Sequence, residues 1–156
     1  MASGSPAPPV IVRRAHPDES VVCADIHVAA RAGMTYLPAL YTVEETRNWM
    51  RDRVFAEERV WVAEVAGRVV GFAALDDGLL STLYVLPEHQ GRGIGTALLT
   101  TVGRHAANGL ELWLFEQNVG ARRFYERHGF ETVRTTDGDN EEGLPDRLMR
   151  RRPPAM

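Results

Sequence analysis

The residues with the clearest chemical pattern form one glycine-rich segment, QGRGIGT, at positions 90–96. An apolar, β-rich run precedes it and an apolar pattern with helical spacing follows it, which predicts a strand, a tight loop and the start of a helix. The first amides of a helix have no acceptor within the helix, and the helix dipole adds partial positive charge, so this arrangement suits phosphate. Glycines let the backbone approach an anion without a Cβ in the way, and Arg92 adds a charge. The alternative is a tight strand-to-helix turn that binds nothing.

The spacing of the glycines excludes two common nucleotide-binding loops. A Walker loop requires Gly-Lys-Ser/Thr after its glycines, and the chain has no lysine. A dinucleotide fingerprint requires Gly-x-Gly-x-x-Gly, whereas Gly91, Gly93 and Gly95 are evenly spaced. Any phosphate bound here therefore belongs to another class of ligand.

A second motif, N-x-x-A-x-x-F-Y-x-x-x-G-F, follows at positions 118–130. Asn118 can cap a short helix that ends at His128, with Gly129 in the left-handed position after it and Phe130 as the apolar contact beyond. Together with Q-x-x-G-x-G at positions 90–95 and the preceding LYV at 83–85, it resembles the GNAT superfamily of acyl-CoA N-acyltransferases. The resemblance covers nearly the whole of residues 10–151.

The resemblance implies acetyl-CoA (coenzyme A) as the cofactor, with its pyrophosphate on the amides of the glycine-rich loop. Its pantetheine arm would enter between the strand before that loop and the parallel neighbour of that strand. The Val85 amide is the usual donor of the family to the developing oxyanion. Asn118 matches a position that contacts the cofactor, although a helix cap would explain it equally well. The implied cofactor-binding residues are Leu83, Val85, Gln90, Gly91, Arg92, Gly93, Ile94, Gly95, Thr96, Asn118 and Tyr125.

Tyr125 occupies the position where the family places a tyrosine beside the cofactor sulfur, so the resemblance implies that it is the general acid. A reference tyrosine has a pKa near ~10 and a thiol near ~8.5, so full proton transfer to the thiolate is uphill by about 2 kcal/mol. Hydrogen bonding to the leaving sulfur is therefore most of its expected role. The alternative is that Phe124 and Tyr125 only pack the helix onto the sheet.

The sequence departs from the family at the general base. Many members carry Glu or His on the strand before the glycine loop, where this chain has LST at positions 80–82. Neither hydroxyl is a base near neutral pH. Strand alternation places Glu116 on the same face as Asn118, although a solvated carboxylate would explain it too. The candidates are Glu116, then Glu141 or Glu142, and a water relay through Ser81 or Thr82.

Two loops are expected to form the walls around the acceptor. Residues 33–41 are unusually apolar for an exposed connection, and residues 137–145 are acidic, which suits a cationic amine. We predict a small primary amine that attacks acetyl-CoA directly in a ternary complex. The alternatives are the N-terminal amine of another protein, which needs an open groove, and a non-catalytic acyl-CoA sensor. The substrate-binding candidates are Tyr36, Tyr41, Glu141 and Glu142.

The apolar pattern predicts the elements that position these groups. Helices are expected at 17–31, 42–54, 96–107 and 118–128, and strands at 10–14, 59–65, 69–75, 79–85, 110–115, 131–136 and 146–151. Thr42 and Glu45 are expected to form a capping box at the head of the second helix. The strand, helix and strand between residues 79 and 115 predict a parallel pair with a right-handed crossover. The expected class is α/β (α+β), a single-domain GNAT-like fold at residues 10–152. Its mixed, mostly antiparallel sheet has about six to seven strands, one parallel βαβ pair and about four flanking helices. Residues 1–9 are expected to form a disordered leader.

Composition excludes several classes of function. The basic residues, all of them arginines, number 18 against 21 acids, so the net charge is 18 − 21 = −3 and no basic stripe predicts a nucleic-acid partner. One cysteine, Cys23, supplies neither a disulfide nor a zinc ligand set, so we expect no metal. The longest apolar run, at 69–75, is too short to span a membrane, which predicts a cytoplasmic protein. A homodimer is expected only as a habit of the family.

Overall fold

The computed structural model describes residues 8–153, so residues 1–7 of the expected leader lie outside the described residues. Pro8 and Pro9 are exposed and belong to no helix or strand. Within this range one seven-stranded sheet has the order β1-β2-β3-β4-β5-β7-β6. The strands are β1 Val10–Arg14, β2 Arg59–Val65, β3 Arg68–Asp76, β4 Leu79–Val85, β5 Leu110–Phe115, β6 Glu131–Thr136 and β7 Asp146–Arg151.

All of these strands lie where the apolar pattern predicts them. In the part of the chain that the structure describes, β4 and β5 form the parallel pair, and the other neighbouring strands are antiparallel. The helix α4 (Ile94–Gly103) connects the parallel strands. The predicted fold class is therefore confirmed.

The N-terminal helices begin and continue through recognisable local features. A short 3₁₀ turn, η1 (Pro17–Glu19), leads into α1 (Ser20–Ala32). Before α2 (Val43–Trp49), the Glu45 amide donates to Thr42 Oγ1 at 3.0 Å and the Thr42 amide donates to the Glu45 carboxylate at 2.9 Å, which is the predicted capping box. The helical backbone then continues through the π turn η2 (Met50–Val54) into α3 (Phe55–Glu57), beyond the expected end at residue 54.

The helix α4 differs from its expected bounds at both ends, for a physical reason at each end. Gly93 adopts a left-handed conformation and is the N-cap, so the helix begins at Ile94 instead of residue 96. Beyond Gly103 the chain continues in tighter turns: the His105 amide donates to the Val102 carbonyl at 2.9 Å, a 3₁₀-type bond. The turn η3 (Pro87–His89) precedes α4. The last helix, α5 (Val119–Arg127), follows β5.

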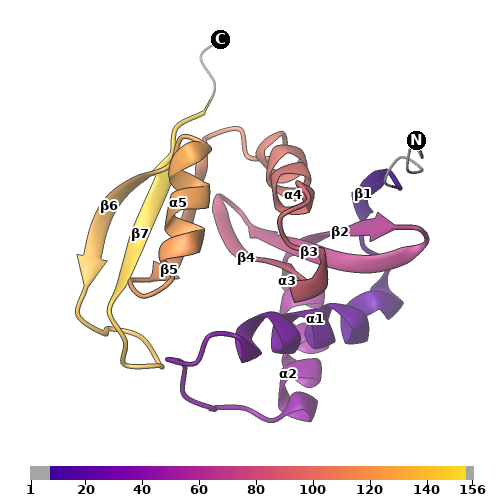
Figure 1. Ribbon diagram of the computed structural model, residues 1–156, viewed down its shortest axis with the longest axis horizontal. Coiled ribbons are helices and arrows are strands. Elements are labelled where there is room, and N and C mark those ends of the chain that lie inside the picture. The colour runs from indigo at the N-terminus through magenta and orange to yellow at the C-terminus, as the bar shows by residue number, and fades with distance from the viewer. Residues whose placement is uncertain (1–7, 154–156) are drawn as a thin grey trace, which may run out of the picture.

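The helices cover both faces of the sheet. Figure 1 shows α4 above strands β2 to β4 and α1 below them, while α5 lies alongside β5 and β7. The side chains of Ile26 on α1, Phe72 on β3 and Leu98 on α4 are buried in one hydrophobic core. This core fixes the position of β4 relative to the helices on both of its faces.

The two parallel strands separate near the glycine-rich loop. Among the described residues, β4 and β5 pair only at Leu79 and Glu111, beside a 2.9 Å hydrogen bond from the Glu111 amide to the Gly78 carbonyl. By contrast, β5 pairs with β7 from Leu110 to Phe115. The carboxyl end of β4 therefore borders an opening in the sheet, which we call the β4–β5 opening.

Candidate active site

The glycine-rich loop presents a row of free backbone amides at the start of α4. The Ala97 amide donates to the Gly93 carbonyl at 3.0 Å, whereas no amide from Gly91 to Thr96 has an acceptor among residues 8–153. Gly91 and Gly93 have φ angles of 77° and 81°, in the left-handed region that favours glycine. Consecutive free amides at a helix start form a site for an anion such as phosphate.

The glycines of this loop differ in backbone angle and in surroundings. A Cβ at Gly91 or Gly93 would meet nothing within 4 Å, so only the backbone angle requires glycine at these two positions. Gly95 has no left-handed angle, but a Cβ there would lie 3.4 Å from Cζ of Phe124. The close approach of α4 and α5 therefore limits the size of a side chain at Gly95, a limit that the even spacing of the glycines does not reveal.

The larger side chains of the loop point in different directions. Gln90 donates from Nε2 to the Val85 carbonyl at 3.1 Å, so it braces the loop against the end of β4. Ile94 is buried in the core, which leaves only its amide to face a ligand. Arg92 is exposed beside the free amides. Of these side chains, the Arg92 guanidinium is the one placed to meet an anion in solvent.

The amides of Leu83 and Val85 face the β4–β5 opening. The Leu86 amide donates to the Val70 carbonyl at 2.8 Å, so this position faces β3. Because alternate residues of a strand direct their amides to opposite neighbours, Val85 and Leu83 direct theirs away from β3. Both residues named by sequence thus present donors on the side where β5 has separated.

Tyr125 is buried between aromatic neighbours on α5. Its ring makes edge contacts with Phe124 and Phe130 at centroid distances of 5.1 and 5.3 Å. Burial, together with nearby Tyr84, raises the pKa of Tyr125 far above its ordinary value. Its hydroxyl has no hydrogen-bond partner among the described residues. Tyr125 is therefore a neutral phenol that packs the helix and still has a free donor.

Asn118 and Thr96 each have a structural partner. The Asn118 Oδ1 accepts a 3.2 Å hydrogen bond from the Ala121 amide, so the predicted helix cap is present. His128, whose role sequence reasoning missed, has Nδ1 2.7 Å from the Phe124 carbonyl and Nε2 3.1 Å from Thr96 Oγ1. Since a carbonyl only accepts, Nδ1 carries the proton in the neutral ring and Nε2 accepts from the Thr96 hydroxyl. This bond ties the start of α4 to the end of α5.

A cavity of about 880 Å³, the large cavity, lies beside β4 on the α1 side. Its walls come from α1, the segment 33–42, α2, β4 and the acidic loop, residues 137–145. Of the four predicted substrate-binding residues, Tyr41, Glu141 and Glu142 line it. Tyr36 lies elsewhere, with its ring 6.1 Å from that of Phe115 and its buried hydroxyl without a partner among the described residues.

The charged groups of the large cavity connect its walls. Arg31 of α1 forms a 3.2 Å ion pair with Glu142, and the Tyr41 hydroxyl donates to Glu141 at 2.6 Å. The hydrogen bond to Glu141 raises the pKa of Tyr41. Glu45 is a third carboxylate on the wall, so acids outnumber the single arginine. The cavity therefore favours a cation.

Aromatic rings form the part of the large cavity that sequence reasoning missed. The His27 ring lies 5.0 Å from that of Tyr84 and 5.3 Å from that of Trp49. Burial, assisted by the charge of Arg31, lowers the pKa of His27 to about 4, so the ring is neutral at pH 7. The sequence does contain a signal for this wall of the cavity: His27 and Arg31 are four residues apart, so they share one face of a helix.

Glu116, one candidate for the general base, is paired with two arginines. It forms an ion pair with Arg147, and Arg122 Nη1 lies 3.6 Å from its carboxylate. It is also absent from the walls of the large cavity. Ser81 and Thr82, the candidates for a relay, both line the cavity. The position of Glu116 therefore does not suit it to take a proton from a group bound there.

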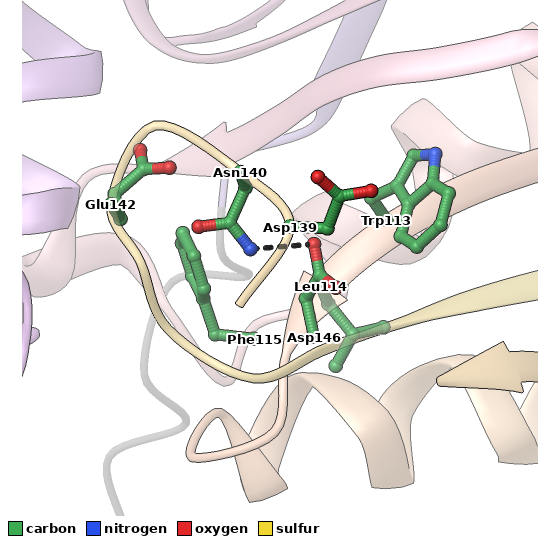
Figure 2. A pocket seen from close by; sticks show the side chains of 7 residues that line it. All are labelled: Trp113, Leu114, Phe115, Asp139, Asn140, Glu142 and Asp146. Carbon is green, nitrogen blue, oxygen red and sulfur yellow. Dashed lines mark hydrogen bonds between the residues drawn. The ribbon is translucent and has the colours of Figure 1, made fainter. Parts of the chain in front are cut away.

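A second, smaller cavity of about 410 Å³ adjoins the acidic loop (Figure 2). Figure 2 shows the Asn140 amide directed at the Asp146 carboxylate, a 3.0 Å hydrogen bond, and the same nitrogen donates to the Leu144 carbonyl at 2.7 Å. Asp146 also accepts from the Thr136 hydroxyl. Glu142 lines both cavities, so the acidic loop forms the boundary between them.

Among residues 8–153, no three His, Cys, Asp or Glu side chains are grouped so that they could hold a metal ion. Cys23 is buried, which raises the pKa of its thiol to about 12. Over the described part of the chain, no helix has the length and apolar character needed to cross a membrane.

Comparison with known proteins gives a family match and several relatives. A family described as "Acetyltransferase (GNAT) domain" matches residues 56–132. An uncharacterized N-acetyltransferase of Archaeoglobus fulgidus is 32% identical over 133 residues, or 73% of this chain and 88% of that protein. The peptidyl-lysine N-acetyltransferase YiaC of Escherichia coli is 34% identical over 101 residues, or 64% of this chain and 68% of YiaC. The uncharacterized N-acetyltransferase MJ1207 of Methanocaldococcus jannaschii is 35% identical over 106 residues, or 58% of this chain, but the match spans only 46% of MJ1207.

Solved structures share the arrangement of the elements. The apo-form of YjaB from Escherichia coli superposes with a TM-score of 0.74 at 25% identity, covering 91% of this chain and 97% of YjaB. The protein yncA from Salmonella typhimurium, solved with its cofactor acetyl-CoA, has a TM-score of 0.73 at 19% identity, and the match covers 95% of this chain and 96% of yncA. The fold is thus common to all three.

Proposed function

Since this chain belongs to the GNAT family of N-acetyltransferases, we propose that it transfers the acetyl group of acetyl-CoA to a small primary amine in the large cavity. The observation that carries the proposal is the row of free amides from Gly91 to Thr96 beside the β4–β5 opening. The opening and the large cavity lie along the same strand, β4. An acyl donor and an amine could therefore meet there.

The residues of the glycine-rich loop suit coenzyme A. Its pyrophosphate is an anion that the amides of Gly91–Thr96 can bind, with Arg92 adding a charge from solvent. The Leu83 and Val85 amides can hydrogen-bond to a pantetheine arm in the β4–β5 opening. Acetyl-CoA supplies the acetyl group as a thioester when it is bound. The presence of acetyl-CoA in yncA, which has the same fold, supports this choice of donor.

Two residues of this chain are proposed to assist the transfer. The Val85 amide would donate to the oxygen on which negative charge develops as the amine attacks. The Tyr125 hydroxyl would donate to the leaving sulfur. Because burial raises the pKa of Tyr125, stabilisation by a hydrogen bond is a more favourable role for it than release of its proton.

The acceptor we favour is a small amine that is a cation in water. The carboxylates of Glu45, Glu141 and Glu142 outnumber Arg31 on the cavity walls, and they would concentrate a cation. Aromatic faces at Trp49 and Tyr84 would contact both the apolar part of the amine and its charge.

A second candidate acceptor is an amine of another protein. The acidic loop separates the large cavity from the second cavity, and Glu142 lines both, so a longer acceptor could contact both hollows. Leu40 and Tyr41 on the rim are exposed, as an open entrance requires. YiaC, one of the relatives, is named for acting on peptidyl lysine.

A screen of acceptors tests the proposal. Purified protein is mixed with acetyl-CoA and with 2-phenylethylamine, spermidine, or a short peptide with a free N-terminus or one lysine, and release of the CoA thiol is followed. We expect the fastest release with the small amines. Turnover with peptides alone would favour the second candidate. Binding of acetyl-CoA without thiol release in any mixture would instead indicate a non-catalytic sensor.

A further inference from the structure

The strand β4 carries a bulge at Ser81. Ala74 of β3 pairs with Thr82 and Leu75 pairs with Leu80, so Ser81 is the additional residue between the two pairs. A bulge changes the direction of the side chains around it. Ser81 and Thr82 both line the large cavity, on the strand that leads to the Val85 amide.

The Ser81 hydroxyl donates a hydrogen bond to the carboxylate of Glu58, which follows α3 directly. Partial burial raises the pKa of Glu58, and the charges of Asp76 and Glu57 act in the same direction. The Ser81 hydrogen bond and the Arg53 cation oppose them. The net direction is upward, so Glu58 accepts a proton more readily than an ordinary glutamate.

The carboxylates on the cavity walls already have partners. Glu142 is paired with Arg31 at 3.2 Å, and Glu141 accepts from the Tyr41 hydroxyl at 2.6 Å. Glu45 accepts the backbone hydrogen bond of its capping box. By contrast, the partner of Glu58 is a hydroxyl, which can pass on a proton as well as donate one.

Besides the carboxylates, His27 is the side chain on the walls that could act as a base. Burial and the neighbouring Arg31 lower its pKa to about 4, because a second positive charge is unfavourable there. Burial raises the pKa of a carboxyl group but lowers the pKa of an imidazole, so it weakens His27 as a proton acceptor. Glu58 is better placed to gain a proton, since protonation removes a charge from a partly buried position.

We propose that Glu58 accepts the proton of the acceptor ammonium group through the hydroxyl of Ser81. An N–H bond of the ammonium group breaks as its proton moves to Ser81 Oγ, while the original Ser81 proton moves to Glu58 Oε1. The ammonium and carboxylate become a neutral amine and a carboxylic acid, and Ser81 keeps one proton throughout. The nitrogen lone pair is then free to attack. This inference rests on the proposed acetyl transfer.

Kinetics against pH test the relay, with 2-phenylethylamine as the probe. Glu58→Gln is expected to lower kcat/KM by about 100-fold near neutral pH. The deficit should shrink toward high pH, because the amine then loses its proton to water without help. Ser81→Ala should behave like Glu58→Gln, whereas Ser81→Thr should restore the rate. Glu131→Gln, which removes an exposed carboxylate of β6 away from Glu58, is the control and should keep the wild-type rate.

A wild-type rate in Ser81→Ala, or a Glu58→Gln deficit that is the same at every pH, would overturn the relay. A second measurement does not need turnover. In a ¹³C titration of the side-chain carboxyl groups, Glu58 should have a higher pKa than an ordinary glutamate, and a still higher one in Ser81→Ala, which lacks the stabilising hydrogen bond. An unchanged titration in Ser81→Ala overturns the relay alone. Absence of wild-type turnover overturns the proposed function and the relay with it.

Discussion

The α-carbon of Gly95 faces the ring of Phe124 so closely that a Cβ there would lie 3.4 Å from the Cζ atom of that ring. Gly95 lies in the first turn of α4 and Phe124 lies on α5. Leu83 of β4 is the next neighbour, at 3.8 Å from the same Cβ position. This contact therefore sets the approach of two helices at the place where the free amides border the β4–β5 opening.

Substitutions at Gly95 should separate packing from contact with a ligand. Gly95→Ala is expected to be tolerated, because its Cβ would be in ordinary contact with Phe124. Gly95→Val adds two further methyl groups on that Cβ and should lower the free energy of unfolding by about 1 to 3 kcal/mol. It should also weaken acetyl-CoA binding, because the first turn of α4 shifts. Gly120→Val, where a Cβ meets nothing within 4 Å, is the control. Denaturation and calorimetry measure both effects, and equal results for Gly95→Val and Gly120→Val would contradict the packing role.

The acidic loop should act on the acceptor and leave the cofactor unaffected. Replacing both Glu141 and Glu142 by Gln is expected to raise the KM of a cationic amine several-fold, since the attraction of the cavity for a cation is reduced. The double variant Asp18→Asn with Glu131→Gln removes two exposed charges elsewhere and should leave this KM unchanged. Steady-state kinetics with 2-phenylethylamine makes the comparison. If the two double variants have the same KM, the acidic loop has no part in selecting the amine.

Stability at acid pH should depend on Glu19. Hydrogen bonding to Arg13 lowers the pKa of Glu19 to about 2, against about 4.3 in an unfolded chain. Because the pKa of Glu19 is lower in the folded state, its contribution to the free energy of unfolding is fully present above the unfolded-state pKa. This contribution is lost as the pH falls toward 2. Urea unfolding of the wild type and Glu19→Gln should therefore differ most near neutral pH and converge in acid. The exposed neighbour variant Asp18→Asn should show no such convergence, and a constant gap for Glu19→Gln would refute the prediction.

Local signals in the sequence were enough to predict the fold. Short runs rich in apolar and β-branched residues located the strands, and the capping box located the start of α2, because both signals depend on residues close together in the chain. The end of α4 was misplaced because its last residues form 3₁₀-type bonds, which an apolar pattern does not distinguish from α-helix. The free amides were also predictable, since glycines before a helix produce them locally.

The candidate site was less predictable where it depends on contacts between distant segments. The ion pair of Glu116 with Arg147 follows from the register of β5 and β7, and the bond from Ser81 to Glu58 follows from a bulge beside β3. Tyr36 turns toward Phe115, although Tyr41 in the same segment lines the large cavity. None of these pairings has a signal in local spacing, so only the folded arrangement reveals them.

Tyr125→Phe should separate catalysis from packing. The variant is expected to lower turnover by about 10- to 100-fold, or about 1.4 to 2.7 kcal/mol, because a donor to the leaving sulfur acts mainly in the transition state. Acetyl-CoA affinity should stay nearly unchanged, since the ring contacts with Phe124 and Phe130 are kept. Turnover assays, calorimetry and thermal melts on the same samples make the comparison. A lower melting temperature with normal turnover would show that the hydroxyl has only a structural role.

Backbone amide spectra during a titration with acetyl-CoA test the central claim most directly, because the claim concerns particular N–H groups. In ¹H–¹⁵N spectra of labelled protein, the largest shifts are expected at the amides from Gly91 to Thr96 and at those of Leu83 and Val85, which face the β4–β5 opening. The amides of Glu57 and Asp18, two exposed residues outside the loop and β4, should not move. Saturable binding that leaves the loop and β4 amides unshifted would contradict the assignment of this site to the cofactor.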